Sequence, residues 1–154
     1  MPSDADQTSV KVGALDWRFP AWKTTFYPVD MPDEWQLTYF NTQFNCVFLP
    51  REVWRSAVSA EHAQWCADTH EQFLFLLEVD AADVAPAELQ DKALALAQSD
   101  RRILWFDRDT SLKDLAAALS GAPGEIPQYL ISRDGNLEQM ERVSTLLEVM
   151  GLSG

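Results

Sequence analysis

Residues 10–28 read VKVGALDWRFPAWKTTFYP, and this stretch decides how the rest of the chain is interpreted. It begins with a short run of apolar and small residues, 10–15, which predicts a strand that ends at Asp16. Seven aromatic or proline residues follow within the twelve positions from Trp17 to Pro28. Such a cluster is unfavourable in water unless the rings pack against one another or cover a ligand or partner. The stretch therefore predicts a strand followed by a packed aromatic loop or a binding surface.

Strands and helices alternate along the remainder of the chain. Short apolar runs predict further strands at Cys46–Leu49, 73–79, Ile103–Phe106 and 127–132. Apolar residues at helical spacing predict helices over 33–44, 59–70, 88–99, 111–121 and 136–152. In the first of these helices we expect one apolar face, made by Trp35, Leu37, Tyr39, Phe40 and Phe44.

This order predicts an α/β fold of five βα units with a parallel sheet, because parallel strands need a helical crossover between them. Three architectures fit: an open doubly wound sheet, an incomplete TIM-barrel-like sheet, or a small closed barrel. An incomplete barrel would need its edges covered by dimerisation or by the N-terminal loop. Residues 1–8 are expected to form a flexible tail, and 9–154 a single domain, since no linker rich in Gly, Ser or Pro divides the chain.

The chain is strongly acidic, with a formal net charge of −12 from 24 acidic and 12 basic residues. This charge argues against non-specific binding to nucleic acids or anionic membranes, both of which need excess Lys and Arg. The N-terminal residues lack the features of a secretory signal, and no apolar run approaches the roughly 20 residues that span a bilayer. Cys46 and Cys66 have no metal-ligand spacing and are expected to be reduced thiols. We therefore expect a cytoplasmic protein.

Charged residues follow several predicted strands, and in a parallel sheet they would face one edge. The candidates for a catalytic site are Asp16, Glu78, Asp107 and Arg133. Two or three carboxylates that converge there could hold a divalent cation or act as general acid and base. The alternative is that these residues shape turns and cap helices, as polar residues after strands commonly do.

The aromatic loop is the second candidate site. As structure, its rings would close one end of the sheet and wrap over the first helix. As a binding surface, exposed aromatic residues are preferred anchors for protein partners. The candidate binding residues are Trp17, Phe19, Trp22, Phe26 and Tyr27.

The first half of the chain, roughly residues 10–80, resembles the YecE-like family of domain-of-unknown-function 72 (DUF72) proteins. Its ordered aromatic residues carry the resemblance, beginning with a strand that leads into a Trp-containing loop ending in Phe-Tyr-Pro. The matching positions are Val12, Gly13, Trp17, Trp22, Phe26, Tyr27 and Pro28, then Glu34, Trp35, Tyr39 and Phe40, then Phe44, Asn45 and Val47, and finally Trp65, Thr69, Phe73 and Phe75. The resemblance implies a TIM-type barrel, although a full barrel is longer than this chain.

The polar residues of the family pattern are replaced. Where the family carries Glu and Asn on its second strand, this chain has Phe48 and Pro50, and the Lys that ends the third strand is Glu78. The resemblance therefore implies a catalytically degenerate relative. We expect a binding or scaffolding domain without a cofactor, which forms a homodimer or docks to a protein partner. The alternative is a metal-assisted hydrolase or isomerase that combines Asp16 with Glu78 or Asp107, with Arg133 as an anion clamp.

Overall fold

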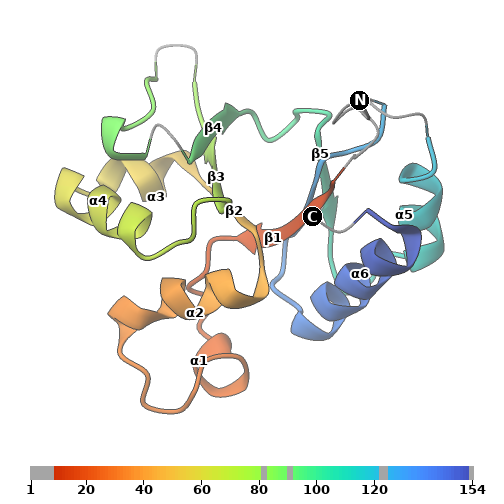
Figure 1. Ribbon diagram of the computed structural model, residues 1–154, viewed down its shortest axis with the longest axis horizontal. Coiled ribbons are helices and arrows are strands. Elements are labelled where there is room, and N and C mark those ends of the chain that lie inside the picture. Colours follow the sequence, from red (N-terminus) through yellow and green to blue (C-terminus); the bar gives the residue numbers. More distant parts are fainter. Residues whose placement is uncertain (1–8, 81–82, 90–91, 122–124, 153–154) are drawn as a thin grey trace. The chain divides into compact units, whose positions relative to one another are not determined.

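The computed structural model describes residues 9–80, 83–89, 92–121 and 125–152. The chain divides into two compact units, each with its own parallel strands and helices (Figure 1). The central unit is the continuous segment Leu15–Gln98, and the terminal unit combines Met1–Ala14 with Ser99–Gly154.

The central unit contains parallel strands in the order β4-β3-β2. Its strands are β2 (Cys46–Leu49), β3 (Leu74–Glu78) and β4 (Ala93–Leu96). All of β2 is buried, as are the three middle residues of β3. A parallel strand covered on both faces is expected to be apolar throughout, which explains why the run at 73–79 forms the middle strand. The strands predicted at Cys46–Leu49 and 73–79 are confirmed.

In the described part of the central unit the helical segments are α1 (Trp22–Thr25), the 3-10 turn η2 (Asp33–Trp35), α2 (Gln36–Gln43), α3 (Arg51–Ser56), α4 (Ser59–Ala67) and the 3-10 turn η3 (Ala87–Leu89). The predicted helices over 33–44 and 59–70 are confirmed by η2 with α2 and by α4. The short helices α1 and α3 were not predicted. Pro50 immediately precedes α3, where its fixed φ and missing N–H are tolerated.

The helix predicted over 88–99 is wrong. After the single turn η3, the chain forms β4, in which Ala93 pairs with Phe75 and Leu96 with Glu78 of β3. Ala and Leu favour helices, but their alternation here also fits a strand, and pairing with β3 outweighs local propensity. The prediction of five βα units was therefore wrong in number, because β3 is followed by the further strand β4 and not by an α-helix.

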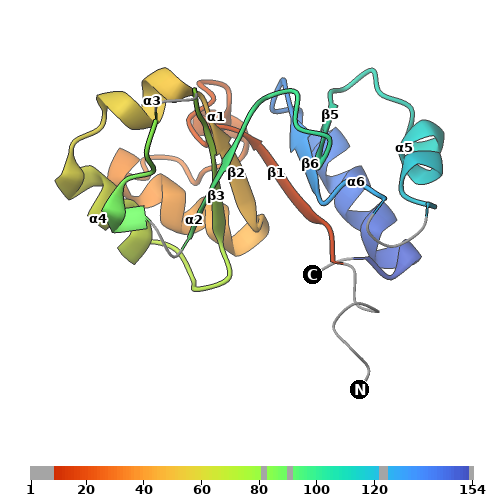
Figure 2. The same cartoon turned by 90° about the horizontal axis from the view of Figure 1, so that it is seen from above.

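The terminal unit contains parallel strands in the order β1-β6-β5. Its elements are β1 (Lys11–Leu15), β5 (Ile103–Phe106), β6 (Tyr129–Ser132), α5 (Leu112–Ala118) and α6 (Leu137–Met150). In both views α5 and α6 lie beside β5 and β6 (Figures 1 and 2). The sequence predicted all five of these elements.

Local sequence sets the ends of α6. The Asn136 side chain accepts a hydrogen bond from the Gln139 amide at 2.9 Å, and Gly151 ends the helix in the left-handed conformation with φ 74°. Asn is a preferred N-terminal cap, and only glycine adopts that final conformation without a steric cost. The inner face of α6, with Met140, Val143 and Leu147, is buried.

The parallel α/β class predicted from the sequence is confirmed in both units. The predicted tail at 1–8 lies outside the described residues, and a single domain over 9–154 stays a prediction. Both cysteines are free thiols, with Cys46 buried and Cys66 half-buried. Among the helices that the structure describes, none has the length and apolar character needed to cross a bilayer.

Candidate functional site

Asp16 turns the chain out of β1 and into the aromatic loop. Its backbone is left-handed, with φ 69°, which Asp tolerates because its short carboxylate can bond nearby groups. The carboxylate accepts the Trp17 amide at 2.6 Å and the Arg18 guanidinium at 3.0 and 3.1 Å. Both oxygens of Asp16 are thus engaged by its immediate neighbours.

Glu78 links the end of β3 to the start of α3. Its Oε1 accepts the backbone N–H of Arg51 at 2.9 Å, and its Oε2 accepts the Gln98 amide at 2.7 Å. The Arg51 side chain in turn donates to both oxygens of Asp83, at 2.5 and 3.0 Å. The hydrogen bond from Arg51 and the backbone N–H of Asp80 lower the pKa of Asp83 to about 2. Glu78 therefore belongs to a bonded network at this end of the central unit.

Asp107 and Arg133 follow neighbouring strands of the terminal unit. The Arg133 amide donates to the Phe106 carbonyl at 2.8 Å, which brings the ends of β5 and β6 together. The Asp107 carboxylate accepts the Asp109 amide at 2.9 Å and so closes a tight turn. The Arg133 guanidinium lies 4.4 Å from the centre of the Trp105 ring, in a cation–π contact.

The four catalytic candidates are distributed over the two units. Asp107 and Arg133 share one edge of the terminal unit, whereas Asp16 and Glu78 lie in the central unit with separate sets of partners. Within the described parts of the chain, no three His, Cys, Asp or Glu side chains gather closely enough to hold a metal ion. A catalytic role for these four residues stays a prediction.

The aromatic loop contributes mainly to the core of the central unit. Trp17, Trp22 and Tyr27 are buried, and the rings of Phe26 and Tyr39 meet edge to face with centres 5.1 Å apart. The Tyr27 hydroxyl donates to the Trp17 carbonyl at 2.5 Å, and burial raises the pKa of Tyr27. Most rings of this loop therefore pack inside the central unit, in line with the interpretation of the loop as structure. Of the five predicted binding residues, Trp17 and Phe19 also border a hollow.

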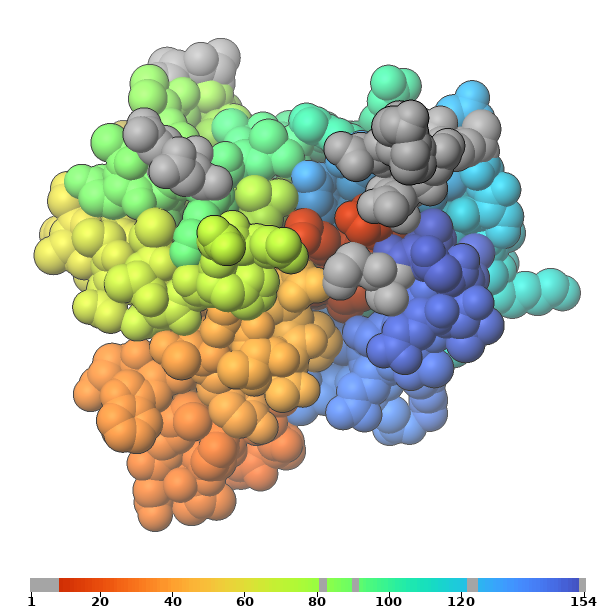
Figure 3. All heavy atoms as spheres, viewed as in Figure 1, coloured from red at the N-terminus to blue at the C-terminus, as the bar shows by residue number. Residues whose placement is uncertain are grey.

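A second hollow adjoins the first, and we name the two together the α2–α4 groove. The groove runs between the aromatic loop, α2 and α4. Its inner part has a volume of about 560 Å³ and its outer part about 630 Å³. Both parts are bordered by Glu34, Gln64 and Asp68, so they adjoin. On the face shown in Figure 3 the orange atoms around α2 border the yellow atoms around α4. The groove lies wholly within the central unit.

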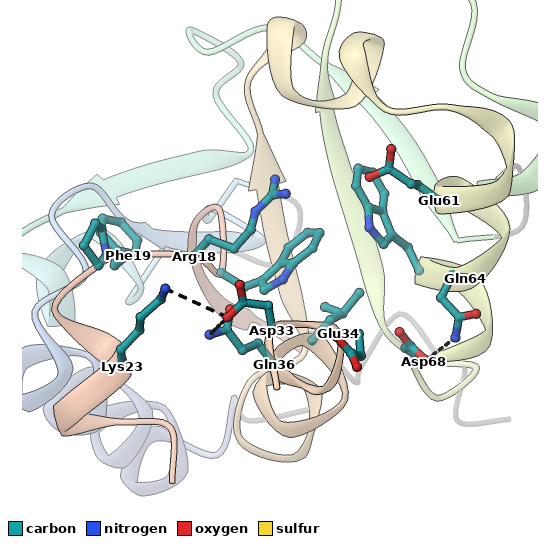
Figure 4. A pocket seen from close by; sticks show the side chains of 13 residues that line it. Arg18, Phe19, Lys23, Asp33, Glu34, Gln36, Glu61, Gln64 and Asp68 are labelled. Atoms are coloured by element: carbon teal, nitrogen blue, oxygen red, sulfur yellow. Dashed lines mark hydrogen bonds and ion pairs between the residues drawn. The ribbon is translucent and has the colours of Figure 1, made fainter. Parts of the chain in front are cut away.

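The inner part has an aromatic floor and a charged rim. Trp17 and Trp65 meet edge to face on the floor, with ring centres 5.2 Å apart. Arg18, Lys23 and Asp33 stand on one wall (Figure 4). Glu61 and Gln64 of α4 stand on the other, together with Asp68, which directly follows α4. Lys23 lies 3.9 Å from Asp33. Arg18 is paired with Asp16, so the rim retains an excess of carboxylates.

The outer part combines apolar surface with two carboxylates. Trp35 has 60% of its surface exposed and stands beside Met31 and Tyr39. Glu34 and Asp68 are its charged lining residues, and no Lys, Arg or His of the described chain borders it. Glu34 forms no hydrogen bond or ion pair with any described residue.

A scan against protein families matches the DUF72 model, "Protein of unknown function DUF72", over residues 11–104. The chain belongs to the DUF72 family. This confirms the predicted resemblance, and the matched range contains the whole α2–α4 groove. Neither the search of curated proteins nor the search of solved structures returned a match. The family's description assigns no activity, so a function has to be inferred from the residues of this DUF72 chain.

Sequence reasoning missed the groove, although one signal for it was present. Trp35 was placed on the same helical face as Leu37, but residues two apart on a helix point in nearly opposite directions. Leu37 and Phe40 are buried, whereas Trp35 is exposed. Helical spacing groups Trp35 with Thr38, Tyr39 and Thr42, all of which line the outer part. The α4 wall could not be found in this way, because it approaches α2 only in the folded chain.

Proposed function

We propose that this DUF72 protein is a protein-binding domain that takes up a basic segment of a partner in the α2–α4 groove. The observation that carries the proposal is the composition of the groove: an aromatic floor beneath a rim with more carboxylates than cations. Aromatic side chains supply contact area at interfaces, and charge complementarity selects and orients the partner.

The occupant that fits the groove best is a segment of another protein, with lysine or arginine beside apolar residues. A second copy of this chain fits less well, because each copy has a formal net charge of −12 and would bring like charge to the carboxylates of the rim. A homodimer that forms through another surface stays a prediction.

The bonding of the candidate catalytic carboxylates also favours binding over catalysis. Asp16, Glu78 and Asp107 each accept hydrogen bonds that turn the chain or hold a helix start. Carboxylates already used in this way are poor candidates for metal ligands or for a general base, which need free lone pairs directed at a ligand. The carboxylate of Glu34, in contrast, has no partner among the described residues.

Fluorescence anisotropy with two labelled peptides tests the proposal. One probe consists of Lys-Gly-Leu repeats, and the other carries Glu in place of Lys. We expect the Lys probe to bind and the Glu probe not to bind. The double variant Glu34→Gln/Asp68→Asn should bind the Lys probe roughly fivefold more weakly, since it removes two exposed ion pairs that contribute about 0.5 kcal/mol each.

A matched control separates the groove from the general acidity of the chain. Glu141→Gln/Glu148→Gln removes the same charge from the exposed face of α6 in the terminal unit. We expect this control to retain the affinity of the wild type. Equal weakening in the two double variants, or equal binding of the Lys and Glu probes, would overturn the proposal. A dimer seen by sedimentation that dissociates in the Glu34/Asp68 variant would replace the partner segment with a second copy.

A further inference from the structure

We infer that the outer part of the groove is a seat for one cationic side chain, a lysine ammonium or an arginine guanidinium. In this seat the cation lies against the face of Trp35, between the carboxylates of Glu34 and Asp68. The inference rests on the proposed function and adds the chemical group that is recognised and the residues that recognise it.

The exposure of Trp35 is the first support. The residue ends η2 and directly precedes α2, whose inner face places Leu37 and Phe40 in the core. This direction of burial leaves the indole of Trp35 on the opposite side, 60% exposed and with no ring contact to another aromatic residue of the described chain. Packing within the central unit therefore gives no reason for a tryptophan at this position. A large exposed ring beside a groove is typical of an anchor for a ligand.

The charges around the ring are the second support. The outer part is bordered by Glu34 and Asp68 and, within the residues that the structure describes, by no basic side chain. A bound cation would therefore meet two carboxylates without a competing charge from this lining. One carboxylate oxygen of Asp68 accepts a hydrogen bond from the Gln64 side-chain amide at 2.7 Å. The carboxylate of Glu34 has no hydrogen-bond partner among the described residues. Tryptophan is the aromatic residue that attracts cations most strongly, through the negative face of its ring.

The apolar surface around the ring fits the stem of the same side chain. Met31 and Tyr39 line the outer part with Trp35 and are half-buried. Lysine and arginine pack their methylene groups on apolar surface while the charged end stays in contact with polar groups and water. A purely apolar side chain would fill the same space but would desolvate the two carboxylates without compensation. An anionic side chain would be repelled by both.

Four small probes test the seat directly by NMR, with the indole N–H of Trp35 as the reporter. The resonance is assigned by its loss in Trp35→Phe. N-acetyl-lysine methylamide and tetramethylammonium are compared with the neutral N-acetyl-norleucine methylamide and the acidic N-acetyl-glutamate methylamide. We expect the two cations to shift the resonance in a saturable way and the other two probes to leave it unchanged. A norleucine shift equal to that of lysine would overturn the inference.

Two substitutions of Trp35 separate a cation–π contact from simple apolar contact. Trp35→Leu keeps an apolar side chain and should weaken binding of the Lys-Gly-Leu peptide about three- to fivefold, whereas Trp35→Tyr keeps a π face and should retain most of the affinity. Unchanged affinity in Trp35→Leu, together with weakened binding in Glu34→Gln/Asp68→Asn, would overturn the cation seat and leave the proposed function standing. A wild-type chain that fails to bind the peptide would overturn the proposed function.

Discussion

Lys92→Met should destabilise the central unit, because the Lys92 ammonium closes the carboxyl end of α4. Its Nζ donates to the carbonyls of Cys66 and Thr69 at 2.8 and 2.7 Å, and to the Thr69 hydroxyl at 3.1 Å. The last carbonyls of a helix have no partner within the helix, and a cation there also interacts favourably with the helix dipole. Lys92, which comes directly before β4, therefore fixes the helix that forms one wall of the groove.

The size of the effect follows from these contacts. Hydrogen bonds from a charged donor contribute roughly 1.5–3 kcal/mol, and the interaction with the helix end adds roughly 0.3–1 kcal/mol. Lys92 is half-buried, so water replaces part of what the methionine loses. We expect Lys92→Met to lower the free energy of unfolding by about 2 kcal/mol. For a chain of this length that corresponds to a fall in Tm of about 4–8 °C.

Urea denaturation followed by tryptophan fluorescence measures this loss, with Lys113→Met as the control. Lys113 is an exposed lysine on α5 in the terminal unit and should cost less than about 0.5 kcal/mol. Lys92→Arg keeps the charge and should retain part of the stability. The reasoning is refuted if Lys92→Met and Lys113→Met have the same effect. It is also refuted if Lys92→Met changes the slope of the transition rather than its midpoint.

Two further predictions concern single polar contacts. Tyr27→Phe should lower the free energy of unfolding by about 1–2 kcal/mol in the same denaturation assay. The substitution removes the buried Tyr27 hydroxyl, which donates to the Trp17 carbonyl oxygen at 2.5 Å. An unchanged free energy of unfolding would mean that water reaches this carbonyl. Asp83→Asn should be destabilising above pH 4, and its difference from the wild type should shrink between about pH 4 and pH 2. The sign follows because Arg51 lowers the pKa of Asp83 in the folded chain from 3.8 to about 2, so the stabilisation is lost as the pH falls. Asp100, whose pKa is also lowered to about 2, affects both proteins equally. A difference in stability that is constant with pH would contradict this account.

Much of the fold could be predicted because the strands are short, continuous apolar runs bounded by polar residues or proline. Cys46–Leu49 and Ile103–Phe106 needed no knowledge of their neighbours. β4 could not be predicted in this way, because the sequence around Ala93–Leu96 satisfies helical and strand patterns equally. Pairing with the edge of β3 favours the strand over the helix, and the hydrogen bonds of this pairing form only in the folded chain.

The candidate site was less predictable than the fold. Carboxylates at strand ends fit both a catalytic site and a set of turns. Asp16 and Asp107 are found in hydrogen bonds with nearby residues, and Glu78 in hydrogen bonds with Arg51 and Gln98, which are distant in the sequence. Their sequence positions alone could not establish these bonds. The groove depends on Asp68, which lies more than thirty positions from Glu34 in the sequence. No local pattern relates residues at such a distance.

The aromatic residues that carry the family resemblance divide into two groups, and the division bears on where function is to be sought. Trp22 and Tyr27 are buried in the central unit, so packing alone explains why this fold needs them. Trp35 belongs to the same ordered set, yet its ring faces solvent beside Glu34 and Asp68. Substituting a buried member lowers the stability of the chain, so a loss of binding in such a variant would not report on recognition. Substituting Trp35 removes little packing, so a loss of affinity in that variant would report on recognition itself.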